Sequence, residues 1–198
     1  MRHLFSTLIL MFVTPVLLQA QSVLKDSTIY RLVNAGRTNA VMTEDIVAHN
    51  IYCTDKGSDE TYNQLWLLKK SGNGWNIQNI FTGQYVQHQN ATYALFTTAT
   101  TPVTLYVYEN STIAGNYNIV NASGGNWGMH CDASYNVVPW YSGSGTPGGS
   151  EWVLERVEIS IEEFNAAREK YDEFNNILSN KDEVIAGFTK FFDNDECT

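Results

Sequence analysis

Two adjacent aromatic residues close to a carboxylate form the part of the sequence best suited to chemistry. Trp140 and Tyr141 end an apolar stretch, and His130 and Asp132 stand shortly before it. Neighbouring residues on a strand point to opposite faces, so one of the two aromatic rings is expected to face solvent. An exposed ring can lie against the apolar face of a sugar, while a carboxylate accepts hydrogen bonds from the sugar hydroxyls. We therefore expect a carbohydrate-binding site here.

Catalytic groups are not suggested by the local sequence. The run His130-Cys131-Asp132 is dense in metal-ligating types, but neighbours on a short strand face opposite ways and do not converge on one ion. His130 therefore also has a simpler interpretation, as a hydrogen-bonded loop histidine. The sequence has no glycine-rich loop followed by lysine, which would indicate phosphate binding. Its acidic residues are too scattered to indicate a glycosidase pair. We expect no enzyme activity, no cofactor and no metal ion.

One pentapeptide pattern occurs three times, at residues 30–34, 75–79 and 117–121. It reads aromatic, any residue, aliphatic, any residue, asparagine, and its copies start 45 and then 42 residues apart. On a strand the aromatic, aliphatic and asparagine side chains share one face, and asparagine suits the turn that follows. A repeat of this length indicates several similar units that bury their apolar faces together.

Each copy opens a unit in which further short strands are expected. Second strands are expected around residues 41–42, 85–86 and 128–129, third strands at 50–53, 93–96 and 136–138, and closing strands at 64–68, 104–108 and 151–154. The closing aromatic residues Trp66, Tyr106 and Trp152 are spaced 40 and 46 residues apart, in step with the opening ones. The pattern predicts an all-β domain of three four-stranded repeats.

Three such units resemble the β-trefoil, and their motifs resemble secreted bacterial ricin-type lectin domains, whose repeats close on Gln-x-Trp. The first unit has this motif intact, as Asn63-Gln64-Leu65-Trp66. The third unit keeps Trp152 without the glutamine, and the second has Tyr106 at the tryptophan position. The resemblance covers residues 28–157 of a domain expected at 21–157, with repeats of about 28–70, 73–110 and 115–157.

In ricin-type lectins each repeat can form a shallow pocket from an aspartate after the second strand, an aromatic residue near the third, and Asn-Gln before the closing tryptophan. In the first repeat the resemblance implies Asn63, Gln64 and, as the aromatic platform, Tyr52. The aspartate position there falls on Thr43, with Asp45 just beyond. The alternative for Gln64 is that it only bonds the backbone beneath the closing tryptophan.

The third repeat matches this pocket differently. Its aspartate position falls on His130, with Asp132 nearby, and Trp140 and Tyr141 supply the aromatic side chains, but the Asn-Gln pair is missing. In the second repeat the aspartate position falls on Gln87, and the pair is missing again. The resemblance therefore implies at most one or two working pockets out of three.

The segment 158–198 has a helical character. Residues 155–198 hold 12 acidic and 5 basic residues, against 9 and 6 in residues 21–154. The run from Ser160 to Glu163 is a capping box, which starts a helix. Apolar residues then recur at threes and fours to Leu178, break off at 179–182, and resume at 184–192. We expect an α-helical hairpin, which packs on itself or on the β-domain, or docks a protein partner.

The first twenty residues predict a secretory signal peptide. They have a basic start and an uncharged apolar run from Leu4 to Leu18, and roughly 15 apolar residues are too few to span a bilayer. No other stretch is long enough to span one. Removing residues 1–20 removes Arg2 and no acid, so the net charge changes from −9 to −10. This charge argues against nucleic acid and anionic membrane as partners. We expect a secreted or cell-surface protein.

Three cysteines remain after this cleavage, namely Cys53, Cys131 and Cys197. Export permits a disulfide, but an odd number leaves one thiol over, and the spacing matches no zinc motif. The alternative is that they are buried small hydrophobic residues. Which two pair, if any, is left open by the sequence.

Two hypotheses of function follow. The leading one is binding of a glycan or polysaccharide by a secreted β-trefoil module, an accessory or surface module without catalysis. The second is a trefoil kept as a protein–protein interaction scaffold without sugar binding, with the acidic helices as its working surface. A trefoil protease inhibitor would need a rigid exposed reactive loop, and nothing in the sequence marks one.

Overall fold

The computed structural model describes residues 24–58, 61–121, 127–141 and 148–193, apart from the side chains of 161 and 182–193. The predicted signal peptide and Cys197 lie outside the described residues. The described strands fall into three sets of four, with one 3-10 turn, η1 (Tyr62–Gln64), in the first set and another, η3 (Gly148–Ser150), in the third. The strands are β1 (Thr28–Asn34), β2 (Ala40–Glu44), β3 (Ile51–Asp55) and β4 (Leu65–Ser71); β5 (Gly74–Asn79), β6 (Tyr85–Val86), β7 (Thr98–Ala99) and β8 (Tyr106–Glu109); β9 (Asn116–Val120), β10 (Trp127–Cys131), β11 (Val137–Tyr141) and β12 (Trp152–Arg156).

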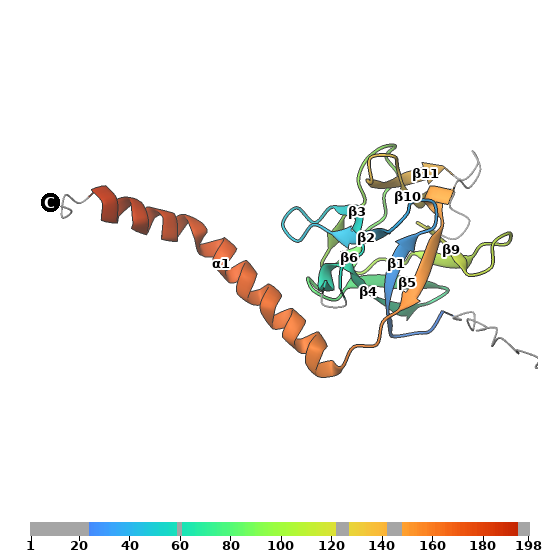
Figure 1. Ribbon diagram of the computed structural model, residues 1–198, viewed down its shortest axis with the longest axis horizontal. Coiled ribbons are helices and arrows are strands. Elements are labelled where there is room, and N and C mark those ends of the chain that lie inside the picture. Colours follow the sequence, from blue (N-terminus) through green and yellow to red (C-terminus); the bar gives the residue numbers. More distant parts are fainter. Residues whose placement is uncertain (1–23, 59–60, 122–126, 142–147, 194–198) are drawn as a thin grey trace, which may run out of the picture.

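Antiparallel pairing closes the first and last strands of the three sets into a barrel. β1 pairs with β4 and β12, β4 with β5, and β9 with β8 and β12. A bridge between Trp75 and Leu105 completes the ring. The pairs β2–β3, β6–β7 and β10–β11 lie outside this ring and contact one another through bridges from Asn50 to Thr97 and from Tyr52 to Asn136. This is the three-repeat arrangement expected from the sequence (Figure 1).

The repeated pentapeptide forms the core of the barrel. Its asparagine side chains, Asn34, Asn79 and Asn121, are buried, and each donates to a main-chain carbonyl of the preceding repeat in the ring, at 2.8, 3.0 and 2.6 Å. The motif therefore both fills the centre and joins each repeat to its neighbour. Its buried aromatic and aliphatic members are Tyr30, Leu32, Trp75, Ile77, Tyr117 and Ile119.

Two closing tryptophans hold the first and third repeats in the same way. Trp66 and Trp152 are fully buried. The indole N–H of Trp66 donates to the carbonyl of Met42 at 2.9 Å, and that of Trp152 donates to the carbonyl of Met129 at 3.1 Å. Met42 and Met129 are therefore equivalent positions, from which other matching positions in the two repeats can be counted.

The second repeat departs from its predicted strands. A third strand was expected at 93–96, but the strand in that place is β7 at Thr98–Ala99. Tyr93 has a φ of 63°, which is incompatible with an extended strand, and it lies in a turn. The backbone N–H of Phe96 bonds the carbonyl of Val137 in the third repeat at 2.8 Å. Contact between repeats therefore sets the path of this segment.

The predicted helical hairpin is wrong, because the segment forms one continuous helix, α1 (Ile161–Asp193). The capping box is confirmed: the Glu163 N–H donates to the Ser160 hydroxyl at 3.1 Å, and the Ser160 N–H donates to the Glu163 carboxylate at 2.7 Å. Ser179 and Asn180 do not break the helix, since such residues cost only a few tenths of a kcal/mol there and no proline follows them. Nothing among the described helices is long and apolar enough to cross a membrane.

The first turns of α1 pack on the β-domain. Ala167 and Tyr171 are buried, and the Tyr171 ring meets the edge of the Phe81 ring at 5.3 Å between centroids. The Arg168 guanidinium donates to the carbonyl of Phe81 at 3.2 Å. Ile177, further along, is 64% exposed, and Figure 1 shows the rest of the helix running away from the domain.

Candidate functional site

A hollow of about 380 Å³ opens in the third repeat, beside β10 and β11. Four of the residues singled out from the sequence line it together, and the others come from the same hairpin and from the β6–β7 loop of the second repeat. Its lining consists of His130, Asp132, Trp140, Tyr141, Trp127, Val138, Pro139, Thr92 and Tyr93. The hairpin therefore gathers the predicted third-repeat residues in one place.

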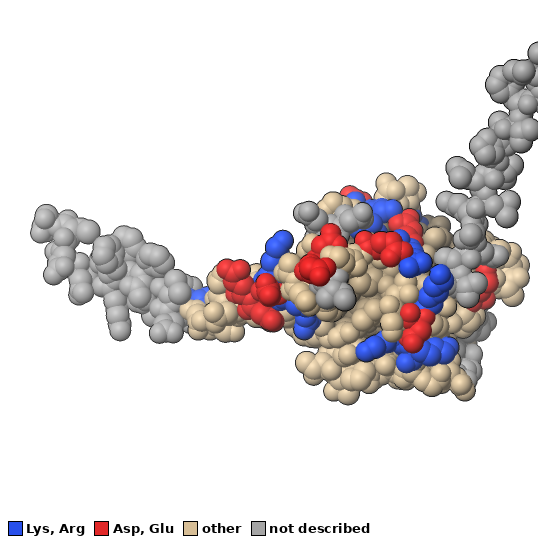
Figure 2. Space-filling view, turned by 90° about the horizontal axis from the view of Figure 1, so that it is seen from below, with Lys and Arg blue, Asp and Glu red and all other residues tan. Residues whose placement is uncertain are grey.

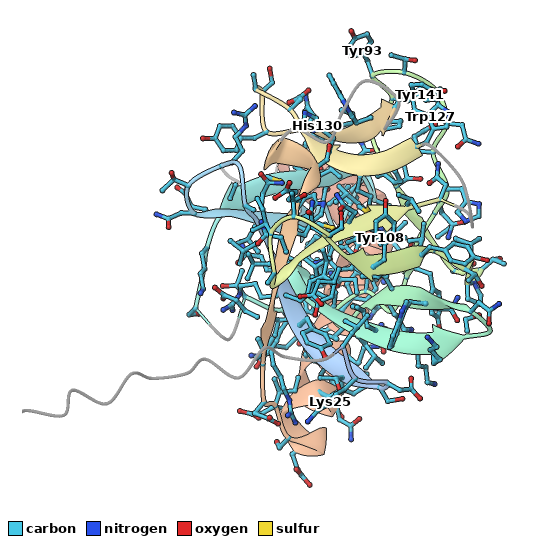
Figure 3. The ribbon with its side chains drawn as sticks, turned by 90° about the vertical axis from the view of Figure 1, so that its right-hand side faces the viewer. Lys25, Tyr93, Tyr108, Trp127, His130 and Tyr141 are labelled. Atoms are coloured by element: carbon cyan, nitrogen blue, oxygen red, sulfur yellow. The ribbon has the colours of Figure 1, made fainter. Side chains whose placement is uncertain are left out.

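The hollow has an aromatic wall set by the register of the hairpin. Trp127 of β10 stands opposite Tyr141 of β11, and their ring centroids lie 5.5 Å apart at 59°. Tyr141 is 45% exposed, so it is the outward member of the Trp140–Tyr141 pair. Figure 3 shows Tyr141, Trp127 and Tyr93 gathered at one edge of the molecule.

His130 lies below this wall as a buried polar group. Its ring packs against Trp140 with centroids 4.8 Å apart, and its Nδ1 lies 2.9 Å from the Ser150 hydroxyl. Burial lowers the pKa of His130, and the positive charge of Arg37 lowers it further. The imidazole is therefore neutral at pH 7. His130 therefore contributes a neutral, hydrogen-bonded ring to the floor of the hollow and not a surface charge.

Asp132 stands at the rim and shapes the turn between β10 and β11. Its Oδ1 accepts the backbone N–H groups of Ser134 and Asn136 at 2.8 and 2.9 Å, and its Oδ2 accepts the Asn136 amide at 3.2 Å. Each carboxylate oxygen accepts more than one hydrogen bond, so Oδ2 keeps capacity for a ligand hydroxyl. The turn holds the carboxylate in one orientation beside the aromatic wall.

Two aromatic residues of the lining, Tyr93 and Trp127, were not among the site residues predicted from the sequence. Tyr93 is 83% exposed and comes from the second repeat, so no local pattern could place it here. Trp127 had a readable signal: a hairpin turning at 132–136 places it opposite Tyr141. That register argument would have added the second ring of the wall.

Gln64 of the first repeat does not reach the surface. It is 2% exposed, and its side-chain amide donates to the Asp55 carbonyl at 2.8 Å and to the Thr54 hydroxyl at 2.9 Å. Its carbonyl oxygen accepts the Gly57 N–H at 2.9 Å. The structure thus supports the alternative in which this motif glutamine bonds the local backbone, and we leave Gln64 out of the proposed site.

The other first-repeat candidates are also committed to local structure. Asn63 donates to the Glu44 carbonyl at 3.0 Å. Asp45 accepts the N–H groups of two following residues, and these bonds lower its pKa. Tyr52 is half-buried on β3. A hollow of about 400 Å³ lies nearby, and of these candidates it takes in Asn63 alone; its other lining residues are Ile46, Thr61, Tyr62, Phe81 and, from α1, Lys170.

Charged side chains of both signs lie on the surface of the β-domain. On the face drawn in Figure 2, acidic and basic side chains are mixed over the β-domain, and acidic side chains gather on the adjoining part of α1. In the part of the chain that the structure describes, no group of three His, Cys, Asp or Glu residues is placed to hold a metal ion. The arrangement in the third repeat is thus one for stacking and hydrogen bonding.

Comparison with solved structures decides the fold. A ricin B-like lectin from Macrolepiota procera, solved with lactose, aligns over 69% of this chain and all of its own, with a TM-score of 0.59 and 15% identity. The Rhizoctonia solani agglutinin aligns over 68% of this chain and 99% of its own, with a TM-score of 0.57 and 19% identity. The chain folds as a β-trefoil.

The trefoil also occurs as a part of larger proteins. An endo-β-galactosidase from Clostridium perfringens that releases GlcNAcα1-4Gal aligns over 66% of this chain but only 33% of its own, with a TM-score of 0.56 and 18% identity. No family model and no curated protein sequence matches the chain. At these identities the likeness establishes the fold, and the site must be argued from its own residues.

Proposed function

We propose that the protein binds carbohydrate at the third-repeat hollow and acts as a secreted or surface module without catalysis. The observation that carries this proposal is the convergence of Trp127, Tyr141 and Tyr93 around a hollow rimmed by Asp132. The rings offer flat apolar surfaces to the C–H face of a sugar, and the Asp132 carboxylate accepts its hydroxyls. The lectin neighbours, one of them solved with lactose, support the class of ligand.

The charge of the chain favours a neutral ligand. The formal net charge is −9, and the one carboxylate in the hollow lies at its rim. An acidic sugar would therefore approach a field of its own sign. We propose neutral glycans or polysaccharides as ligands, and export rests on the predicted signal peptide.

The test is a glycan array followed by NMR titration of the exported protein with lactose and other neutral mono- and disaccharides. Tyr141→Ala is expected to weaken binding about tenfold, which corresponds to about 1.4 kcal/mol. Tyr135→Ala is the matched control, because Tyr135 is also 45% exposed but lies outside the lining. An array without hits, together with unchanged shifts on titration, would refute the proposal.

A second candidate function is protein docking through α1. It is favoured by the exposure of Ile177 on a helix that extends beyond its contacts with the domain (Figure 1). Truncation after residue 175 keeps the buried Tyr171 and removes the projecting part. Loss of a co-purifying protein on this truncation, with sugar binding unchanged, would assign docking to α1; an identical set of co-purifying proteins would refute it.

A further inference from the structure

We propose that Cys53 and Cys131 form a disulfide bond that joins the first repeat to the third beneath the candidate hollow. Cys53 lies on β3 and Cys131 on β10, and both belong to the same buried core cluster, at 5% and 0% exposure. Cys131 stands between His130 and Asp132, which line the hollow. The two cysteines are far apart in sequence, so their meeting is a product of the trefoil closure.

Both thiols are free and buried in the structure. An interaction with the Cys131 side chain, together with burial, holds the pKa of Cys53 far above its usual range. The same interaction lowers the pKa of Cys131, and the Cys131 Sγ lies 3.9 Å from the carbonyl oxygen of Asp132. β3 and β10 are not paired with each other, so a bond between Cys53 and Cys131 would join two strands that the sheet hydrogen bonds do not link.

The backbone around the pair is held by independent contacts. The Cys53 N–H donates to the carbonyl of Tyr135 at 2.7 Å, and Tyr52 forms a bridge with Asn136. Arg37 donates to the Asp132 carbonyl at 3.2 Å, which anchors the chain on the other side of Cys131. These contacts hold β3 beside the turn that follows Cys131.

The chemistry is ordinary thiol–disulfide exchange with an external disulfide, either a low-molecular-weight one or that of an oxidoreductase. Cys53 and Cys131 each lose a proton, a mixed disulfide forms and is displaced, and two electrons reduce the external disulfide to two thiols. Since both sulfurs are buried in the folded protein, exchange takes place while the chain folds. The predicted export places that folding in an oxidising compartment.

The cross-link closes the chain between residues 53 and 131 into a loop. Restricting a loop of this length in the unfolded state is expected to raise the melting temperature by something on the order of 10 °C. It also fixes the strand that leads into Asp132. Only the importance of this strand for sugar binding rests on the proposed function.

Peptide mapping tests the bond without any variant. The full chain, expressed with export, is denatured in an alkylating reagent without reductant and digested with two proteases. The expected result is a peptide pair joining Cys53 to Cys131, about 2 Da lighter than the two thiol forms and separated by reductant, with Cys197 alkylated. Alkylated Cys53 and Cys131, or either one joined to Cys197, would overturn the proposal.

Melting curves give a second measurement. Reductant is expected to lower the melting temperature of the wild-type protein and of Cys197→Ser by a similar amount. It should leave Cys53→Ala and Cys131→Ala unchanged. An equal response of all four proteins would count against the bond. Because the mapping does not involve sugar, a failed glycan array leaves its outcome unaffected.

Discussion

The first and third repeats share one framework but present different side chains on it. Counting from Met42 and Met129, the first-repeat residues Ala40, Thr54 and Asp55 match Trp127, Trp140 and Tyr141 of the third. Strand register and buried tryptophan are the same in both. Small and polar side chains in the first repeat are replaced by aromatic rings in the third. These rings line the hollow of the third repeat.

The residue two positions before each tryptophan shows the same contrast. Gln64 extends to the end of β3 and fills that space with three hydrogen bonds. Ser150 is its counterpart in the third repeat, and its short hydroxyl bonds His130 instead. The repeat that keeps the motif glutamine thus uses it for structure, while the repeat that lost it carries the hollow. In the proposed assignment, the repeat with the intact motif is therefore not the repeat that binds sugar.

The largest expected effect tests the shared framework. Trp152→Ala and Trp66→Ala should each destabilise the fold by about 3–5 kcal/mol, because each removes a fully buried indole and its hydrogen bond. Urea unfolding followed by circular dichroism measures this. If one substitution cost less than about 1 kcal/mol, the two repeats would not share the same core.

A smaller effect separates structure from binding in the first repeat. Gln64→Ala should cost about 1–3 kcal/mol, because it removes a buried side chain that bonds the half-buried N–H of Gly57 and the carbonyl of Asp55. Sugar affinity measured by titration should not change. Gln78→Ala is the control, since Gln78 is half-buried and makes one side-chain bond, to the Gly83 carbonyl. Loss of sugar binding in the Gln64 variant would return the first repeat to the site.

The pH dependence of the third repeat follows from His130. Its folded-state pKa is lowered by burial, so the folded protein binds a proton less readily than the unfolded chain does. Stability from this residue is present above the unfolded value of about 6.5 and is lost as pH falls toward the folded pKa. Unfolding free energies from pH 7.5 to 5 should decline more in the wild type than in His130→Gln. Parallel profiles would contradict this.

Glu44 of the first repeat should respond in the opposite direction, with the smallest effect. Burial raises its pKa despite hydrogen bonds from Thr82, Thr98 and His49. The folded state therefore takes up the proton at higher pH than the unfolded chain, and stability from this residue rises as pH falls through the raised pKa. Relative to Glu44→Gln, the wild type should gain stability as the pH is lowered from 7 toward 4.5. A relative loss on acidification would show that the carboxylate stays ionised.

Much of the fold was readable because its signals are local. The pentapeptide alternation, the closing tryptophans of the first and third repeats and the Ser160–Glu163 capping box each lie within a few residues, and each forms as predicted. The closing aromatic expected at Tyr106 is wrong, because the buried residue opposite Trp75 in the second repeat is Leu105. The continuation of α1 was missed because Ser179 and Asn180 resemble a break but impose only a weak penalty. The strand expected at 93–96 failed because contact with Val137 in another repeat sets its path.

The sequence by itself determined the three-repeat scaffold and the grouping of Asp132, Trp140 and Tyr141, because a hairpin brings together residues that are close along the chain. Only the tertiary structure decided that Tyr93 joins this group, that Gln64 is buried, and that Cys53 and Cys131 belong to one buried core cluster. These contacts cross from one repeat to another or depend on burial. Both follow from closing three units into a ring, which no short stretch of sequence encodes.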